Sequence, residues 1–222
     1  MLPFVAANPY PLLTTQTHTY AEEQVHAAEV DRWLGLRTEE IERELVCNTA
    51  PEERKALWIG LPVRSLLTPY TEIRNILQHL QPRPAETVVD LGAGYGRIGF
   101  VMGKHFPESR FLGYEFVESR VAEANRCLKL RNIQNATVLQ ADLKAKLFAP
   151  QQAEYYFLYD YSTPASIQKT LNDLGSIAKL RKITVVGRGR SGRDLIEQQH
   201  PWLSQVVRPQ HGPHYSIYRS RE

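Results

Sequence analysis

The fold is decided by the stretch Thr87-Val88-Val89-Asp90-Leu91-Gly92-Ala93-Gly94-Tyr95-Gly96-Arg97-Ile98-Gly99. Its first residues are β-branched, which favours a strand, and that strand ends next to a carboxylate. Glycines follow, and they allow a backbone with positive φ to turn and to pass close to a ligand. The apolar residues after Arg97 predict a helix, whose first N–H groups and positive dipole end point back at the turn. The stretch therefore predicts a strand, a ligand-cradling turn and a helix.

The length and composition of the chain indicate one globular α/β domain with a small extension, since it has 222 residues of which 42% are hydrophobic. The net charge of +3 permits an acidic partner without requiring one. No apolar run approaches the roughly 20 residues that cross a bilayer, and the N-terminus lacks the pattern of a secretion signal. We therefore expect a cytoplasmic protein with no membrane partner. Cys47 and Cys127 are far apart, so we expect buried, reduced thiols and no metal site.

Residues 1–65 predict a helical N-terminal extension. After an irregular arm over residues 1–19, the apolar spacing predicts a helix from Tyr20 that Gly35 ends. Thr38 offers an N-cap for a second helix, and Pro51 suits the first position of a third. We expect this extension to lie over the strand ends as a lid, and residues 66–222 to form the main domain.

The main domain alternates between strand-like and helical segments, which predicts a parallel sheet covered on both faces. Its last two strands should form an antiparallel hairpin, because the seven residues between them cannot hold a crossover helix. The predicted fold is thus an α/β, seven-stranded, mostly parallel, doubly wound sheet that ends in an antiparallel hairpin. The expected strands lie at residues 87–91, 110–116, 137–140, 155–161, 183–186, 205–207 and 215–218.

Polar residues stand at the expected carboxyl ends of the first four strands, where open α/β sheets bind their ligands. Glu115 lies about 20 residues beyond the glycine turn, the spacing at which a carboxylate reaches the hydroxyls of a ribose. Asp142 ends the third strand beside Leu143 and can accept a hydrogen bond from an adenine amine. Asp160 and Tyr161 end the fourth strand. These side chains predict a nucleotide-like ligand at this edge.

The combination resembles the class I S-adenosylmethionine-dependent methyltransferases over roughly residues 68–220. The segments Asp90-Leu91-Gly92-Ala93-Gly94-Tyr95-Gly96-Arg97 and Ala141-Asp142-Leu143 are similar to the first motif and the adenine-edge motif of that class. The resemblance implies S-adenosylmethionine as the cofactor. It also implies that Gly92 and Gly94, with Ala93 between them, line the methionine part and that Asp90 reaches its ammonium. Glu115 would hold the ribose, and Asp142 with Leu143 the adenine.

Three residues are candidates for catalysis. Methyl transfer from a sulfonium needs in-line placement of the nucleophile and partial desolvation. A general base, where one is used, should lie at the end of the fourth strand, at Asp160 or Tyr161. Relatives that methylate base amino groups have an Asn/Asp-Pro-Pro-aromatic motif there, and this chain has Asp-Tyr-Ser-Thr. The segment Thr68-Pro69-Tyr70-Thr71-Glu72 resembles non-SET protein-lysine methyltransferases, in which a tyrosine approaches the methionine end, and this makes Tyr70 the third candidate.

The methyl acceptor stays open between a protein lysine, RNA and a small molecule. Two other classes also stay open. An NAD-dependent oxidoreductase is one, because Gly94-x-Gly96-x-x-Gly99 matches a dinucleotide fingerprint, although it begins after the strand end. A non-catalytic module that binds the cofactor is the other. The basic residues Arg188, Arg190 and Arg193 either bind phosphate or an acidic peptide at the rim of the site, or are solvated loop charges.

Overall fold

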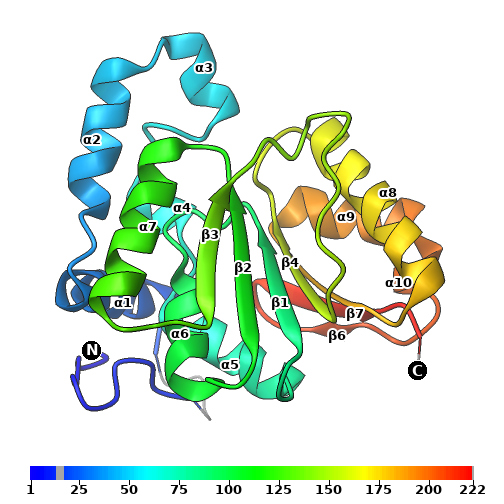
Figure 1. The fold of residues 1–222 in the computed structure, drawn as a ribbon, viewed down its shortest axis with the longest axis horizontal. Coiled ribbons are helices and arrows are strands. Elements are labelled where there is room, and N and C mark those ends of the chain that lie inside the picture. Colours follow the sequence, from blue (N-terminus) through cyan, green and yellow to red (C-terminus); the bar gives the residue numbers. More distant parts are fainter. Residues whose placement is uncertain (14–17, 222) are drawn as a thin grey trace.

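The computed structural model describes residues 1–13 and 18–221 and contains one seven-stranded sheet with helices on both faces (Figure 1). The strand order is β3-β2-β1-β4-β5-β7-β6. β1 to β5 pair in parallel, β7 is antiparallel to β5, and β6 is antiparallel to β7. The strands are β1 (Thr87–Leu91), β2 (Arg110–Glu115), β3 (Ala136–Gln140), β4 (Tyr155–Tyr159), β5 (Thr184–Arg188), β6 (Gln210–His211) and β7 (Tyr215–Arg219). The predicted fold class is confirmed.

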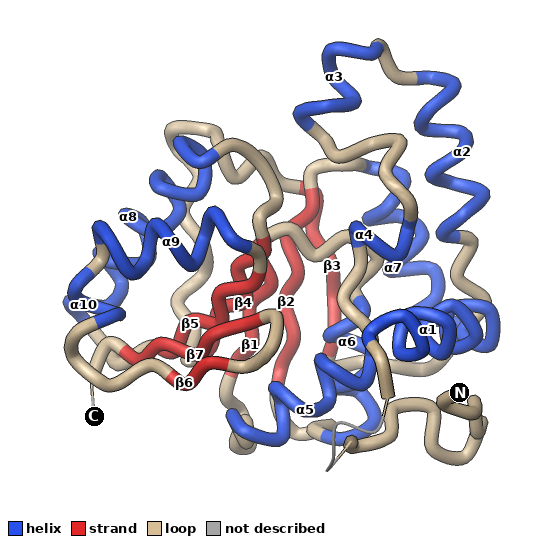
Figure 2. Tube along the Cα trace, turned by 180° about the vertical axis from the view of Figure 1, so that it is seen from behind, coloured by secondary structure: helices blue, strands red, loops and turns tan. Residues whose placement is uncertain are grey.

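The helices form two layers, one on each face of the sheet. Successive strand residues point to opposite faces and so belong to different cores. Val88 belongs to the apolar core shared with α1, α2, α5, α6 and α7, and Val89 to the core shared with α8, α9 and α10. α1 lies against α5, and α5 against α6 (Figure 2). The helices are α1 (Tyr20–Leu34), α2 (Thr38–Asn48), α3 (Pro51–Ala56), α4 (Val63–Leu66), α5 (Tyr70–Leu80), α6 (Arg97–His105), α7 (Glu118–Leu130), α8 (Pro164–Leu180), α9 (Arg190–Gln199) and α10 (Pro201–Ser204).

The N-terminal helices form much as the sequence predicts. α1 begins with a capping box between Thr19 and Glu22 and ends at Gly35, whose φ of 81° is left-handed. α3 starts at Pro51, as expected. Thr38, however, is the first residue of α2 and not its cap, and the cap residue Arg37 makes no side-chain hydrogen bond to the helix. Part of the predicted irregular arm, residues 14–17, lies outside the described residues.

Further details of the expected fold are wrong. The fourth strand, expected over residues 155–161, ends at Tyr159, so Asp160 and Tyr161 lie in the loop that follows it. The sixth strand was expected at residues 205–207, but β6 forms at Gln210–His211, where His211 pairs with Ser216. The Gly212-Pro213-His214 turn fixes this register, since a tight hairpin turn outweighs the β-branched pair at 206–207. Cys127 is buried as expected, but Cys47 is exposed, because α2 turns that position away from the core. No described helix is long and apolar enough to cross a bilayer.

Candidate functional site

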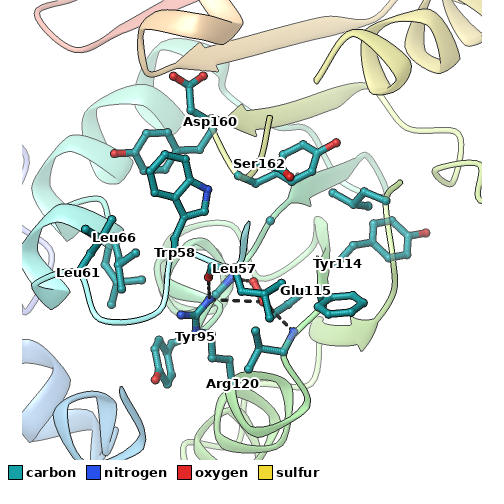
Figure 3. Close-up of a pocket in the computed structure, with 18 of the residues that line it drawn as sticks. Leu57, Trp58, Leu61, Leu66, Tyr95, Tyr114, Glu115, Arg120, Asp160 and Ser162 are labelled. Atoms are coloured by element: carbon teal, nitrogen blue, oxygen red, sulfur yellow. Dashed lines mark hydrogen bonds and ion pairs between the residues drawn. The ribbon is translucent and has the colours of Figure 1, made fainter. Parts of the chain in front are cut away.

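A cavity of about 280 Å³ lies at the carboxyl ends of β1 to β5 (Figure 3). Its floor is formed by the residues that follow these strands, and one wall is formed by the N-terminal segment 57–67. The structure thus brings together most of the side chains that the sequence singled out. The predicted site residues in its lining are Gly92, Gly94, Glu115, Asp142, Leu143, Asp160 and Tyr161.

The glycine turn after β1 has a backbone that favours glycine. Gly92 has a φ of 100° and Gly94 a φ of 52°, which side-chain-bearing residues rarely adopt. A Cβ atom at Gly92 would lie 2.7 Å from the Cβ of Tyr161, so the turn also passes close to the end of β4. The Gly94 N–H donates a hydrogen bond of 2.9 Å to Oε2 of Glu115. The turn is therefore held against both neighbouring strands.

Glu115 ends β2 and is 7% exposed. Besides Gly94, its carboxylate accepts a hydrogen bond of 2.9 Å from the Val117 N–H, and Nη1 of Arg120 lies 3.7 Å from Oε1 (Figure 3). A carboxylate offers about four lone-pair directions. Two are used by short hydrogen bonds, so Glu115 keeps capacity to accept bonds from hydroxyl donors such as those of a ribose.

Asp90 is a buried carboxylate, 8% exposed, and has no hydrogen-bond partner within the described part of the chain. Burial and, secondly, the negative charge of Glu115 raise the pKa of Asp90 from 3.8 to about 7. A nearby cation would stabilise the ionised carboxylate and lower this pKa again. Asp90 is therefore suited to pair with an ammonium group, such as that of a methionine. Asp90 and Ala93 lie just outside the cavity lining, and Ala93 packs on Gly113 of β2.

The end of β3 supplies an apolar wall beside an acceptor. Oδ1 of Asp142 accepts a hydrogen bond of 2.9 Å from the Lys144 N–H, which leaves its other oxygen for a ligand. Leu143 is buried, and Phe116 is 44% exposed on the other side of the lining. This combination suits a flat ring that carries an amine, as adenine does. Together with the glycine turn, these groups fit S-adenosylmethionine.

Asp160 and Tyr161 line the cavity, but their polar atoms are engaged elsewhere. Asp160 accepts hydrogen bonds from the N–H groups of Ser191 (2.9 Å) and Gly192 (2.7 Å) at the start of α9. The Tyr161 hydroxyl donates to the Ser166 carbonyl (3.0 Å) in α8 and lies 2.7 Å from a second hydroxyl there, and burial raises its pKa. Asp160 therefore holds the start of α9 in place, and Tyr161 does the same for α8.

The structure does not bring Tyr70 to the cavity. Its side chain is fully buried at the start of α5, where its hydroxyl donates a hydrogen bond of 2.7 Å to Asp31. The Arg97 guanidinium lies 4.9 Å from the ring centre, and Tyr10 stacks on the ring at 5.2 Å. These contacts join α1 and the N-terminal arm to α5 and α6.

The sequence reasoning missed the N-terminal part of the cavity wall. Trp58 lines the cavity, is 38% exposed and has a φ of 55°, unusual for a large side chain. Leu61 is also 38% exposed. The signal was present, because the chain places large apolar residues in a segment that Gly60 and Pro62 keep out of a helix. Other lining residues that were not predicted as site residues include Glu42, Leu57, Ser65, Leu66, Leu67, Tyr95, Tyr114, Arg120 and Tyr159.

The basic residues near β5 do not form one patch. Arg188 is buried and its Nε lies 2.6 Å from Oε1 of Glu72, an ion pair between β5 and α5. Arg190 is almost fully exposed and lies 3.4 Å from Asp194, one turn along α9. No group of three or more potential metal ligands occurs among residues 1–13 and 18–221.

Comparisons with known proteins agree with the fold and with a methyltransferase-type domain. Residues 73–155 match the family model "Methyltransferase small domain", whereas curated protein sequences gave no match. The solved RNA methyltransferase from Salinibacter ruber, in complex with S-adenosyl-L-homocysteine, is 21% identical over 69% of this chain and 91% of that chain, with a TM-score of 0.50. A SAM dependent methyltransferase from Aquifex aeolicus is 13% identical over 80% of this chain and 96% of that chain, also at 0.50.

Precorrin-6y C5,15-methyltransferase from Geobacter metallireducens is 15% identical over 73% of this chain and 94% of that chain, with a TM-score of 0.55. Two other solved chains are matched over only 50% of their own length. At these identities the likenesses show a shared fold. The chain shares the fold of these solved S-adenosylmethionine-dependent methyltransferases, and its residues 73–155 match the methyltransferase small-domain model.

Proposed function

We propose that the cavity binds S-adenosylmethionine along the ends of β1, β2 and β3 and presents its methyl group to a neutral acceptor that enters beside Trp58. One observation carries the proposal. Asp90, for which the described residues offer no hydrogen-bond partner, is followed along this edge by the glycine turn, by Glu115 with free lone pairs and by Asp142. When bound, the cofactor supplies an electrophilic methyl group on a cationic sulfonium.

The chain's own residues divide the binding work. The Asp90 carboxylate pairs with the ammonium, and the backbone of Gly92 and Gly94 allows the methionine part to lie close. Glu115 accepts hydrogen bonds from the ribose hydroxyls, and Asp142 accepts one from the adenine amine beside Leu143. Charge-assisted hydrogen bonds of this kind are the stronger ones in proteins, so the three acids set affinity and orientation.

The acceptor side of the cavity favours an uncharged acceptor. Its walls there are aromatic and apolar, including Trp58, Leu61, Leu66 and Tyr159. The carboxylate on this side, Asp160, is already bonded to two N–H groups and positions the start of α9. A protein lysine would arrive as an ammonium and would need a free carboxylate and a base to lose its proton. An uncharged ring nitrogen, in a base of RNA or in a small molecule, already has a free lone pair and needs neither.

The test is labelling with methyl-tritiated S-adenosylmethionine in the presence of separated protein, RNA and small-molecule fractions of a lysate. We expect the wild-type protein to label the RNA or the small-molecule fraction, and Glu115→Ala to label it much more weakly at low cofactor concentration. Label on lysine side chains of the protein fraction would contradict the neutral acceptor. No label in any fraction, with cofactor binding intact, would indicate a non-catalytic binding module.

A further inference from the structure

A closed ring of polar contacts runs from the glycine turn into the N-terminal extension. Gly94 donates to Glu115, which lies 3.7 Å from Arg120 of α7. Arg120 donates to both carboxylate oxygens of Glu42 in α2, at 2.8 and 3.0 Å. The ring closes through the hydroxyl of Tyr95, the residue after Gly94, which donates to Glu42 at 2.8 Å. The contact between Glu42 and Arg120 spans 78 residues of the sequence.

The three charged side chains of this ring are buried. Their charges therefore interact strongly, and removing one of them changes how the other two pair. The side chains of Glu42, Arg120 and Glu115 are each between 7% and 8% exposed. Bidentate pairing directs the planar guanidinium of Arg120 at Glu42. The remaining nitrogen, Nη1, is beyond hydrogen-bond distance of Glu115, at 3.7 Å. Glu42 thus keeps the cation close to Glu115 without letting it occupy that carboxylate.

The same guanidinium also fixes part of the cavity wall. Nη1 of Arg120 makes a long hydrogen bond of 3.4 Å to the carbonyl of Leu57, the residue before Trp58 (Figure 3). Leu57, Trp58, Glu42 and Arg120 all line the cavity. The Arg120 side chain therefore connects three parts of the site: Glu115, helix α2 and the wall segment 57–67.

We infer that Glu42 is a positioning residue of the cofactor site, which acts through Arg120 to keep the lone pairs of Glu115 available for the ribose hydroxyls. This inference rests on the proposed role of Glu115. Without the charge of Glu42, Arg120 turns to Glu115, and the two form a tight pair that competes with the cofactor. The N-terminal extension then contributes to cofactor affinity from a residue that does not itself bind the cofactor.

The test is a double-mutant cycle of Glu42→Gln and Glu115→Gln, with S-adenosylhomocysteine affinity measured by calorimetry at a temperature where circular dichroism shows every variant to be folded. We expect Glu42→Gln to weaken binding by about tenfold, within the range of coupling for groups of one network. The double variant should bind no more weakly than Glu115→Gln, because the effect of Glu42 passes through that carboxylate.

Arg37→Gln is the matched control, because Arg37 joins the same two helices, α2 and α7, through an ion pair of 3.1 Å to Glu123 outside the cavity lining. We expect its affinity to equal that of wild type. Tyr95→Phe removes the 2.8 Å hydrogen bond to Glu42, together with a long one of 3.4 Å to the Thr38 carbonyl, and serves if Glu42→Gln does not fold. Tyr95→Phe should weaken binding by about two- to threefold. This is less than the effect of Glu42→Gln, because Glu42 keeps its charge and its two hydrogen bonds to Arg120.

Three results would overturn the inference: unchanged affinity in Glu42→Gln (or in Tyr95→Phe when it stands in), additive losses in the double variant, or an equal loss in Arg37→Gln. Failure of the proposed function gives a different pattern. Wild type would then not bind S-adenosylhomocysteine, or Glu115→Gln would bind it as wild type does.

Discussion

Asp31 of α1 and Arg97 of α6 form an ion pair that is buried on both sides, with Nη2 of the arginine 2.5 Å from Oδ2 of the aspartate. Arg97 lies in the first turn of the helix that follows the glycine turn. The same arginine donates to the Thr68 carbonyl at 2.9 Å, so it also fixes the segment before α5. The N-terminal helices are therefore built into the core that supports the cofactor site.

Asp31→Ala is expected to lower the free energy of unfolding by about 3–5 kcal/mol, because it leaves the Arg97 charge buried without its partner. Urea denaturation measures this change. Asp194→Ala is the control, since its pair with Arg190 is largely exposed, and its free energy of unfolding should stay within about 0.5 kcal/mol of wild type. Equal losses in the two variants would contradict the buried pair's role.

Cofactor affinity is expected to depend on pH through Asp90. With a pKa of about 7, its carboxylate is mostly protonated at pH 6 and mostly ionised at pH 8. Only the ionised form pairs with the ammonium, so S-adenosylhomocysteine should bind up to about tenfold more tightly at pH 8 than at pH 6. Asp90→Asn should bind weakly with little pH dependence across this range. A wild-type profile as flat as that of the variant would contradict the pairing.

The raised pKa of Asp90 also makes the stability of the cofactor-free protein depend on pH, but here a higher pH is unfavourable. The pKa of Asp90 is higher in the folded protein than the ordinary 3.8, so the folded state holds the proton more tightly. The stability that this group contributes is present below about pH 4 and is lost as the pH rises through about 7. Without cofactor, Asp90→Asn should therefore melt higher than wild type at pH 8, and the gap should close toward pH 4.

Asp160→Ala is expected to lower the free energy of unfolding by about 1 kcal/mol, the usual cost of losing a helix-capping side chain. Asp160→Asn keeps an oxygen that can accept one of the two N–H bonds and should lose less. In Asp160→Asn the pH dependence of kcat should match that of wild type. A vanished acidic limb in that profile, with stability unchanged, would instead identify Asp160 as a general base.

Gly92→Ala is expected to weaken S-adenosylhomocysteine binding and to lower the free energy of unfolding by about 1–3 kcal/mol, the cost of a strained backbone. The φ of 100° and the 2.7 Å approach to Tyr161 both oppose a side chain there. Gly175→Ala in α8 is the control. Its new Cβ would meet Trp202 at an ordinary 3.4 Å, so it should stabilise the helix by about 0.5–1 kcal/mol. A harmless Gly92→Ala would contradict the strained turn.

The strand-turn-helix unit was predictable because local preference and tertiary packing agree there. β1 occupies Thr87–Leu91 and α6 begins at Arg97, both as expected. Gly99 serves the packing of α6 on β2, because a Cβ there would lie 2.8 Å from the Phe111 ring. Short elements were less predictable. β6 is two residues long, and the adjoining turn, more than the β-propensity of Val206 and Val207, decides its place.

The gathering of Glu115, Asp142 and Asp160 at one cavity was predictable because parallel strands place their carboxyl ends at one edge. The contacts from the N-terminal extension were not, since nothing local indicates that Glu42 will pair with an arginine 78 residues away. Tyr70 precedes β1 in the expected way, but its surroundings depend on Asp31 and Tyr10, which the sequence does not place. Long-range ion pairs of this kind are set by the assembled fold.

The most direct test of the central claim is a calorimetric titration of wild type and Glu115→Ala with S-adenosylhomocysteine, with NAD titrated in parallel. We expect wild type to bind S-adenosylhomocysteine and not NAD. Glu115→Ala should bind the former at least about tenfold more weakly, the loss of charge-assisted hydrogen bonds to the ribose. Equal affinity in the two proteins, or a wild type that binds NAD instead, would contradict the assignment of this site.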